Sequence, residues 1–177
     1  MKKIIILTII SALAYSGKAQ VIIGKDTPTN DAVSVEFADD EPRGMILPYV
    51  ETVPSGPTPG TIIFDTTDKK VKYWNSTAWV LLSDDDSTPA TIGVVDLSIQ
   101  TTRTESSTAK TAIGNGADTD TTTGILVLTD PEKAMILPKL NKPYETIVNP
   151  APGMMVYDTE SHQLAVFNGT VWSFWKP

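Results

Sequence analysis

The chain contains one stretch of sequence twice. Residues 59–66 read PGTIIFDT and return as residues 152–159, PGMMVYDT; residues 73–79 read YWNSTAW and return as residues 166–172, VFNGTVW. Both copies lie 93 positions apart, so no insertion interrupts this part of the match. A repeated unit of this kind is typical of proteins in which small units stack to bury a shared core. The repeat therefore favours a modular scaffold over a fold built around a single active site.

The repeat extends towards the N-terminus with a slightly different spacing. The tetrapeptide MILP occurs at residues 45–48 and again at residues 135–138, which lie 90 positions later. The second unit must therefore contain three extra residues before its PG pair, around the Pro- and Asn-containing stretch 141–144. Insertions of this composition are typical of surface loops.

The sequence predicts an all-β protein made of two tandem units of small hairpins and meanders. Short apolar runs rich in β-branched residues are separated by Gly, Pro, Asn and Asp, and no helical periodicity extends over three turns after residue 19. We expect the first β-unit over residues 20–82, a polar linker over 83–110 and the second β-unit over 111–177. Within the linker, residues 91–99 alternate enough to predict one strand.

Each unit ends in a predicted hairpin whose turn contains an asparagine, Asn75 or Asn168. Asparagine tolerates the positive φ that two-residue turns require. A two-residue loop in the first unit would pair Trp74 with Thr77. Both faces of each hairpin would then be largely apolar. Such a hairpin needs cover on both sides, from the other unit, from the linker strand or from another chain.

Aromatic residues beside these turns are the predicted ligand or interface residues, namely Trp74, Trp79, Phe167 and Trp172. Exposed aromatic platforms stack on sugars or anchor protein interfaces. The alternative is that these side chains fill the core or the contact between the units, which is the commoner role of large aromatic residues.

Residues 1–19 have the pattern of a signal peptide. Two lysines precede an apolar run over residues 4–14, and a small-x-small sequence follows at 17–19. The apolar run is shorter than the roughly 17 residues that a membrane span needs. We expect cleavage before Gln20 and export through the Sec pathway to the outer-membrane surface or the medium, rather than retention in the periplasm. No membrane span is expected.

Charge and composition argue against several classes of function. The chain has no cysteine, so stability must come from packing or assembly rather than disulfides. The formal charge of −7 falls to about −10 when the three lysines of residues 1–19 are removed. An acidic surface repels phosphate backbones, which argues against binding of nucleic acid. The single histidine, His162, leaves no spare base for a Ser-His-Asp triad and excludes a multi-histidine zinc site.

Carboxylates in the sequence are better explained by structure than by catalysis. Asp65 and Asp158 occupy equivalent positions at predicted strand ends, where each can accept backbone N–H bonds in the next turn. Residues 84–86 are three consecutive aspartates without the spacing of a calcium loop, which indicates a solvated boundary. We expect no catalytic, cofactor-binding or metal-binding residues.

Several short elements together resemble exported, repeat-containing surface proteins of the Bacteroidota. The QVIIG sequence after the signal peptide resembles their Q-V-G-I-G start, and RGMILP resembles their K-G-x-L-x-P-R element. Residues 59–66 resemble their P-x-G-x-x-x-Y-[DN]-T element. Residues 75–79 resemble their Y-N-G-x-x-W element. The usual arginine after the proline is replaced by Tyr49 and Lys139. Some of these proteins resemble tail-fibre or adhesin segments, so the resemblance implies a surface location and a type of architecture.

The resemblance also implies a possible modification. Proteins of that lineage carry O-glycans at Asp-[Ser/Thr]-Thr triplets, and Thr66, Ser87 and Thr121 match this pattern. Taken together, the sequence predicts a non-enzymatic exported surface protein that acts through protein–protein contact or self-association, as a structural, adhesin-like or accessory subunit. A glycan-binding module that uses the four aromatic residues is the second hypothesis, and a hydrolase is a distant third.

Overall fold

The computed structural model describes residues 20–39, 41–83, 95, 97–104, 106 and 108–176. The predicted signal peptide, the three aspartates at 84–86 and Ser87 fall outside these ranges. Within them, strands predominate, and the helices α2 (Ser98–Thr101) and α3 (Pro143–Thr146) have a single turn each. No helix in the described ranges has the length and apolar character needed to cross a bilayer. The prediction of an all-β fold is confirmed.

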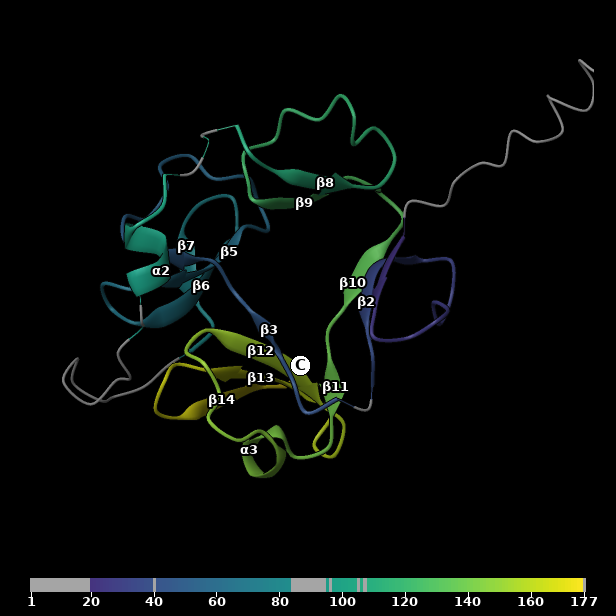
Figure 1. The fold of residues 1–177 in the computed structure, drawn as a ribbon, viewed down its shortest axis with the longest axis vertical. Helices are drawn as coiled ribbons and strands as arrows, with labels where there is room; N and C mark the ends of the chain where they lie inside the picture. The colour runs from purple at the N-terminus through teal and green to yellow at the C-terminus, as the bar shows by residue number, and fades with distance from the viewer. Residues whose placement is uncertain are drawn as a thin grey trace, which may run out of the picture.

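The first unit contains a sheet of four strands in the order β4-β5-β6-β7. These strands are β4 (Tyr49–Val50), β5 (Ile62–Asp65), β6 (Lys70–Trp74) and β7 (Trp79–Leu81). β4 runs parallel to β5, whereas β5, β6 and β7 form an antiparallel meander. This sheet lies at the left of Figure 1.

The second unit repeats this sheet strand for strand at the bottom of Figure 1. Its strands are β11 (Lys139–Leu140), β12 (Met154–Asp158), β13 (Gln163–Phe167) and β14 (Trp172–Trp175). β11 is parallel to β12 and the rest is again an antiparallel meander. Even the turn between the second and third strands is reproduced, because Lys69 (φ 58°) and His162 (φ 54°) both have positive φ. The predicted duplication is therefore confirmed as two copies of one sheet.

A parallel strand pair precedes the sheet in each unit. β1 (Val21–Ile23) pairs with β2 (Val33–Phe37), and β8 (Thr111–Ile113) pairs with β9 (Leu126–Leu128). Both pairs end in the same way, since the Ala38 N–H donates to the Ile23 carbonyl at 2.8 Å and the Thr129 N–H donates to the Ile113 carbonyl at 2.9 Å. The repeat thus includes the N-terminal part of each unit.

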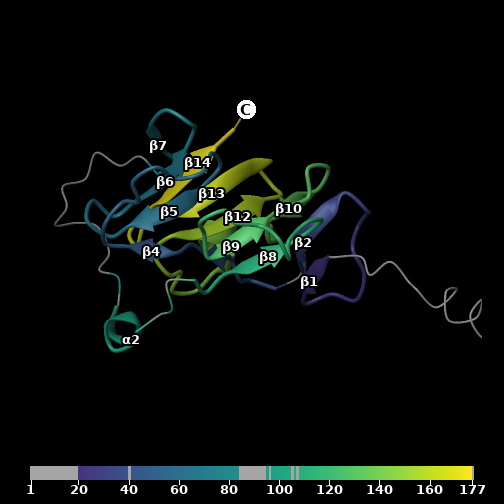
Figure 2. The same ribbon diagram turned by 90° about the horizontal axis from the view of Figure 1, so that it is seen from above.

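The two units are interlocked rather than separate. β3 (Met45–Ile46), from the first unit, adds antiparallel to β12 of the second, and β10 (Ala134–Ile136), from the second unit, adds parallel to β2 of the first. In Figure 2, seen from above, β13 and β14 overlap β5 and β6, and buried residues of both sheets pack together. One buried apolar cluster draws on both units and contains Leu47, Phe64, Val71, Met155 and Val166. The expected stacking of the units on each other is therefore present, and each unit shields apolar surface of the other.

The linker differs from its prediction at its C-terminal end. Of the expected strand over 91–99, residues 91–94 and 96 lie outside the described part, and Ser98 and Ile99 begin α2 instead. The Thr101 N–H donates to the Leu97 carbonyl at 3.0 Å, and the Thr101 hydroxyl donates to the same carbonyl at 3.1 Å. Local side-chain bonds of this kind compete with a strand for the backbone, which explains the difference.

Candidate functional site

The four predicted aromatic residues form two equivalent pairs, one in each terminal hairpin. Trp74 and Trp79 have ring centroids 5.6 Å apart at an interplanar angle of 57°. Phe167 and Trp172 have centroids 5.2 Å apart at 45°. Both are tilted arrangements within the range that favours aromatic pairs. The structure therefore brings the predicted residues together within each unit.

The register of these hairpins differs from the prediction by two residues. Trp74 lies opposite Trp79 rather than Thr77, and Phe167 lies opposite Trp172. The loops are longer than two residues because an asparagine side chain organises each of them. A shift of two positions leaves every side chain on its expected face, since strand side chains alternate with period two.

Asn75 shows how the longer loop is held. Its side-chain oxygen accepts hydrogen bonds from the N–H groups of Thr77 at 3.0 Å and Ala78 at 2.8 Å, and its own N–H donates to the Ala78 carbonyl at 3.2 Å. Asn168 makes the same set of bonds, and its oxygen accepts from Thr170 and Val171 at 2.9 Å each. The asparagine thus satisfies backbone donors that a tighter turn would pair with the opposite strand.

The two aromatic pairs differ in the burial of one member. Phe167 is buried, and Trp172 packs against a second apolar cluster made of Leu140, Val156 and Ala165. Trp74 and Trp79 are half-buried. Trp172 is half-buried as well, so Phe167 is the only buried member of the four, and Trp172 differs from the first pair in packing against that cluster.

The equivalent aspartates bind backbone N–H groups, as their positions predict. Asp65 accepts a hydrogen bond from the Thr67 N–H at 2.9 Å, and Asp158 accepts one from the Glu160 N–H at 3.0 Å. Asp65 also pairs with the Lys72 ammonium at 2.7 Å. Burial alone would raise the pKa of Asp65, but the bonds from Lys72 and Thr67 outweigh it and lower the pKa. Both aspartates are thus turn residues.

Other candidate side chains occupy exposed or half-buried loop positions. His162 is exposed in the turn after β12. Thr66 is half-buried and its hydroxyl donates to the Val50 carbonyl at 3.2 Å, whereas Thr121 is exposed. Among the residues that the structure describes, no three His, Cys, Asp or Glu side chains lie close enough to hold a metal ion.

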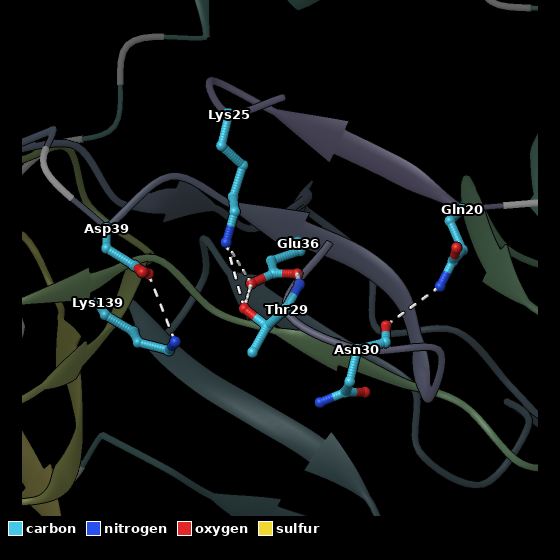
Figure 3. A network of polar contacts seen from close by, with 7 residues as sticks. All are labelled: Gln20, Lys25, Thr29, Asn30, Glu36, Asp39 and Lys139. Atoms are coloured by element: carbon cyan, nitrogen blue, oxygen red, sulfur yellow. Dashed lines mark hydrogen bonds and ion pairs between the residues drawn. The ribbon is translucent and has the colours of Figure 1, made fainter. Parts of the chain in front are cut away.

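A buried carboxylate that the sequence analysis did not single out lies in β2. Glu36 is fully buried and binds the Lys25 ammonium at 2.8 Å and the Thr29 N–H at 2.8 Å, and the Thr29 hydroxyl also donates to it. Figure 3 shows these groups converging on the carboxylate from the loop between β1 and β2. The only signal in the sequence is a glutamate within the apolar run VSVEF.

The groups that bind Glu36 favour the ionised form of its carboxyl group. Burial raises the pKa of a carboxyl, but the hydrogen bonds from Lys25 and Thr29 outweigh it and lower the pKa of Glu36 from 4.5 to about 2. The same contact raises the pKa of Lys25. Glu36 is therefore an ionised anchor at neutral pH for the loop between β1 and β2. Figure 3 also shows an ion pair between the two units, from Lys139 to Asp39 at 3.4 Å.

The contact between the units is built around the turn before β12 together with the first two residues of that strand, which we call the junction turn (residues 152–155). The Leu47 N–H donates to the Gly153 carbonyl at 3.2 Å, and the Tyr49 hydroxyl donates to the Pro152 carbonyl at 3.0 Å. Met45 and Ile46 form the added strand β3 beside it. The MILP segment of one unit thus holds the PG segment of the other.

Glycine at position 153 makes this close approach possible. Gly153 has φ +75°, and a Cβ atom built there would lie 3.0 Å from the Phe64 Cβ and 3.1 Å from its ring. Phe64 is fully buried and meets Tyr49 edge-on, with ring centroids 5.7 Å apart. The repeated MILP and PG elements are prominent in the sequence, but nothing local in them shows that each binds the other.

These features describe an interaction surface. Asp65 and Glu36 are held by lysines and backbone donors and Asp158 by backbone donors, and the most developed contacts join strand edges and apolar side chains of the two repeats.

Comparison with known proteins agrees with the repeat. A family model described as a phage tail-like trimerisation region matches the chain twice, over residues 22–101 and over residues 98–176. Together these matches cover most of the chain. Neither a curated protein nor a solved structure matches it.

Proposed function

Since the chain belongs to the family of the phage tail-like trimerisation region, we propose that it is a structural, non-enzymatic subunit that assembles into a trimer of identical chains. The observation that carries this proposal is the double match, because two trimerisation regions account for nearly all of the described residues. Assembly, rather than chemistry on a substrate, is then the main task of the chain.

Exposed apolar side chains on the strands support self-association. Val21 and Ile23 of β1 are 37% and 47% exposed, and Leu126 of β9 and its neighbour Ile125 are 47% and 56% exposed. Exposed apolar side chains that gather on strands can mark interaction sites. Chain association would remove this surface from water.

The location that we propose is outside the inner membrane, at the cell surface or in the medium. The support is the basic, apolar and small-residue pattern of residues 1–19. An adhesin-like or accessory role at that surface is consistent with a tail-fibre-like scaffold. The measurement is N-terminal sequencing of the protein recovered from fractionated cells; an intact Met1 in the cytosolic fraction would reject export.

Sedimentation equilibrium of the purified protein tests the trimer. We expect a single species of three times the chain mass, stable upon dilution to low micromolar concentration. A monomer over the whole concentration range would reject the proposal, and a dimer would reject the trimeric stoichiometry.

A glycan-binding role is the second candidate, and the half-buried Trp74 and Trp79 pair favours it. Tilted aromatic pairs at a hairpin end can stack on a sugar ring. Binding to a glycan array that is lost in Trp79→Ala but kept in Trp172→Ala would support this role, because Trp172 packs against the cluster of Leu140, Val156 and Ala165. Absence of binding in the wild-type protein would reject it.

A further inference from the structure

The contact between the MILP segment of one repeat and the PG turn of the other is made in one direction only, and this asymmetry identifies a further binding surface. The junction turn of the second unit is held by the MILP segment and Phe64 of the first unit. The equivalent turn of the first unit, residues 59–62, and the equivalent surface of the second unit both lack such a partner in the described part of the chain. The first unit therefore has a free turn, and the second unit has a free surface of the kind that binds such a turn.

The free surface of the second unit is a hollow of about 300 Å³. It is lined almost entirely by apolar side chains, from Met135, Ile136, Leu137, Lys139 and Tyr157. By the repeat, these are the counterparts of the residues that contact the junction turn in the first unit, namely Met45, Ile46, Leu47, Tyr49 and Phe64. The hollow thus has the residues of a binding surface that is occupied in one unit and open in the other.

The free turn of the first unit already has the conformation of the junction turn. The Gly60 N–H donates to the Trp74 carbonyl at 2.9 Å, and the Gly153 N–H donates to the Phe167 carbonyl at 2.8 Å. Both glycines have positive φ, +88° and +75°. Because the two turns share these bonds and dihedral angles, the free turn needs no rearrangement to make the same contact.

The surroundings of the two glycines differ. A Cβ atom at Gly153 would meet Phe64 at 3.0 Å, whereas a Cβ atom at Gly60 would meet nothing within 4 Å. Gly60 is exposed, and the counterpart of Phe64 in the second unit, Tyr157, is only half-buried. The turn and the hollow are therefore both solvent-accessible where their counterparts are packed together.

We propose that the hollow of the second unit binds residues 59–62 of a second copy of this chain, in the geometry of the contact within the chain. In this arrangement Ile136 lies opposite Thr61 and Met135 lies opposite Ile62 of the neighbouring chain. The Leu137 N–H donates to the Gly60 carbonyl, as the Leu47 N–H does to Gly153. This proposal rests on the proposed function, since it specifies the interface by which the trimer forms.

The strand edges needed for this contact are available. β10 is the last strand in the sheet order β1-β2-β10, and its outer edge has no partner strand among the described residues. On β5, β4 pairs with Phe64 and Asp65, so in the described structure the edge at Thr61 and Ile62 has no strand beside it. Unpaired edges of this kind are templates for strand addition from another chain.

Lys139 occupies the position of Tyr49 and retains the required chemistry. The Tyr49 hydroxyl donates to the Pro152 carbonyl at 3.0 Å. An ammonium group is likewise a hydrogen-bond donor, so Lys139 can donate to the Pro59 carbonyl of the neighbouring chain.

The geometry also accounts for a closed assembly. The turn and the hollow are different surfaces on different units, so the contact between chains is heterologous, and heterologous contacts form a ring when the rotation closes. In a trimer each chain contributes its hollow to one neighbour and its turn to the other. Every unit then makes the same contact, within a chain or between chains.

Cysteine cross-linking tests this interface, because the wild-type chain contains no cysteine. Ile46 and Met154 lie opposite each other where β3 pairs with β12, next to the hydrogen-bonded pair of Leu47 and Gly153. Ile46 and Met154 thus form a non-hydrogen-bonded pair with Cα atoms about 4.5 Å apart, a spacing that a disulfide can bridge. The equivalent pair between chains is Thr61 and Ile136.

We expect the double variant T61C/I136C, once oxidised, to run on a non-reducing gel as a species of three times the chain mass, and to return to the monomer with reductant. The matched control I46C/M154C should form its disulfide within one chain, as shown by peptide mass spectrometry. The negative control T61C/V148C should form no link, because Val148 is 83% exposed and does not line the hollow.

Sedimentation of each variant in reductant separates the two proposals. A trimer in which T61C/I136C does not cross-link, while I46C/M154C does, would overturn this interface and leave the trimer intact. A monomer would overturn both. A T61C/I136C disulfide within a single chain would also overturn the interface. Cross-linked oligomers from T61C/V148C in the same amount as from T61C/I136C would overturn it as well.

Discussion

The hydroxyl of Tyr49 donates a hydrogen bond of 3.0 Å to the carbonyl oxygen of Pro152, which lies 103 positions further along the chain. This bond joins the MILP-containing segment of the first repeat to the junction turn of the second. It lies beside the backbone bond from Leu47 to Gly153 and the packing of Phe64 on that glycine. At this one of the contacts between the repeats, polar and apolar interactions therefore act together.

Tyr49→Phe should remove the donor and keep the ring. Burial raises the pKa of the Tyr49 hydroxyl, so it remains protonated as a donor at neutral pH. We expect a loss of about 1 kcal/mol in the free energy of unfolding, the usual value of one hydrogen bond. Urea denaturation measures it, with Tyr73→Phe as the control because the Tyr73 hydroxyl has no hydrogen bond in the described structure. Equal losses in both variants would contradict the prediction.

Gly153→Ala should destabilise the protein more than a glycine replacement at an open turn. Position 153 combines φ +75° with a Cβ contact of 3.0 Å to Phe64, whereas Gly116 has φ +77° with its nearest neighbour at 4.0 Å. The left-handed backbone costs an alanine about 1–2 kcal/mol at either position. Overpacking adds about 1–3 kcal/mol at position 153 alone. Thermal unfolding of both variants measures the difference, and equal shifts would contradict it.

Asn75→Ala should weaken the first hairpin, whereas Asn75→Asp should not. The asparagine oxygen accepts hydrogen bonds from Thr77 and Ala78, and an aspartate offers an acceptor at the same place. For Asn75→Ala we expect the free energy of unfolding to fall by no more than about 0.5–1.5 kcal/mol for each lost hydrogen bond, because the loop is exposed. Hydrogen exchange of the two N–H groups gives a local measurement. Unchanged protection in the alanine variant would show that the side chain does not hold the loop.

Acid should weaken the protein through Glu36. Its pKa in the folded protein is about 2, below the ordinary 4.5, so the unfolded chain binds the proton more readily. The stabilising contribution is therefore complete above pH 4.5 and is lost as the pH falls from 4.5 through 2. Glu36→Gln should lower stability at pH 7 and flatten this part of the pH profile. The control Glu132→Gln, at an exposed position, should leave the stability at pH 7 and the pH profile unchanged. A pH profile that Glu36→Gln does not alter would contradict the role given to Glu36.

Much of the fold was predictable because its signals are local. Alternating β-branched runs and turn residues predicted the all-β class, and the repeat predicted two equivalent units. The hairpin register was wrong by two residues because the Asn75 side chain takes backbone N–H groups that a two-residue turn would leave free to pair. The aromatic pairs followed from the same hairpins, since a shift of two positions keeps Trp74 and Trp79 on one face.

The contact between the repeats was not predictable from the residues that form it. Leu47 and Gly153 lie in motifs that are visible in both units, yet the bond between them joins backbone groups that every residue possesses. The buried Glu36 was also missed, because its partners Lys25 and Thr29 look like ordinary polar loop residues.

By itself the sequence determined which segments form strands and turns and that the chain is built twice from one plan, because side-chain periodicity and turn chemistry act over a few residues. Only the tertiary structure decided which strand edges meet, placing β3 on β12 and β10 on β2. Edges expose the same N–H and C=O groups in every strand, so the choice of partner depends on how Phe64, Met155 and their neighbours close a common core.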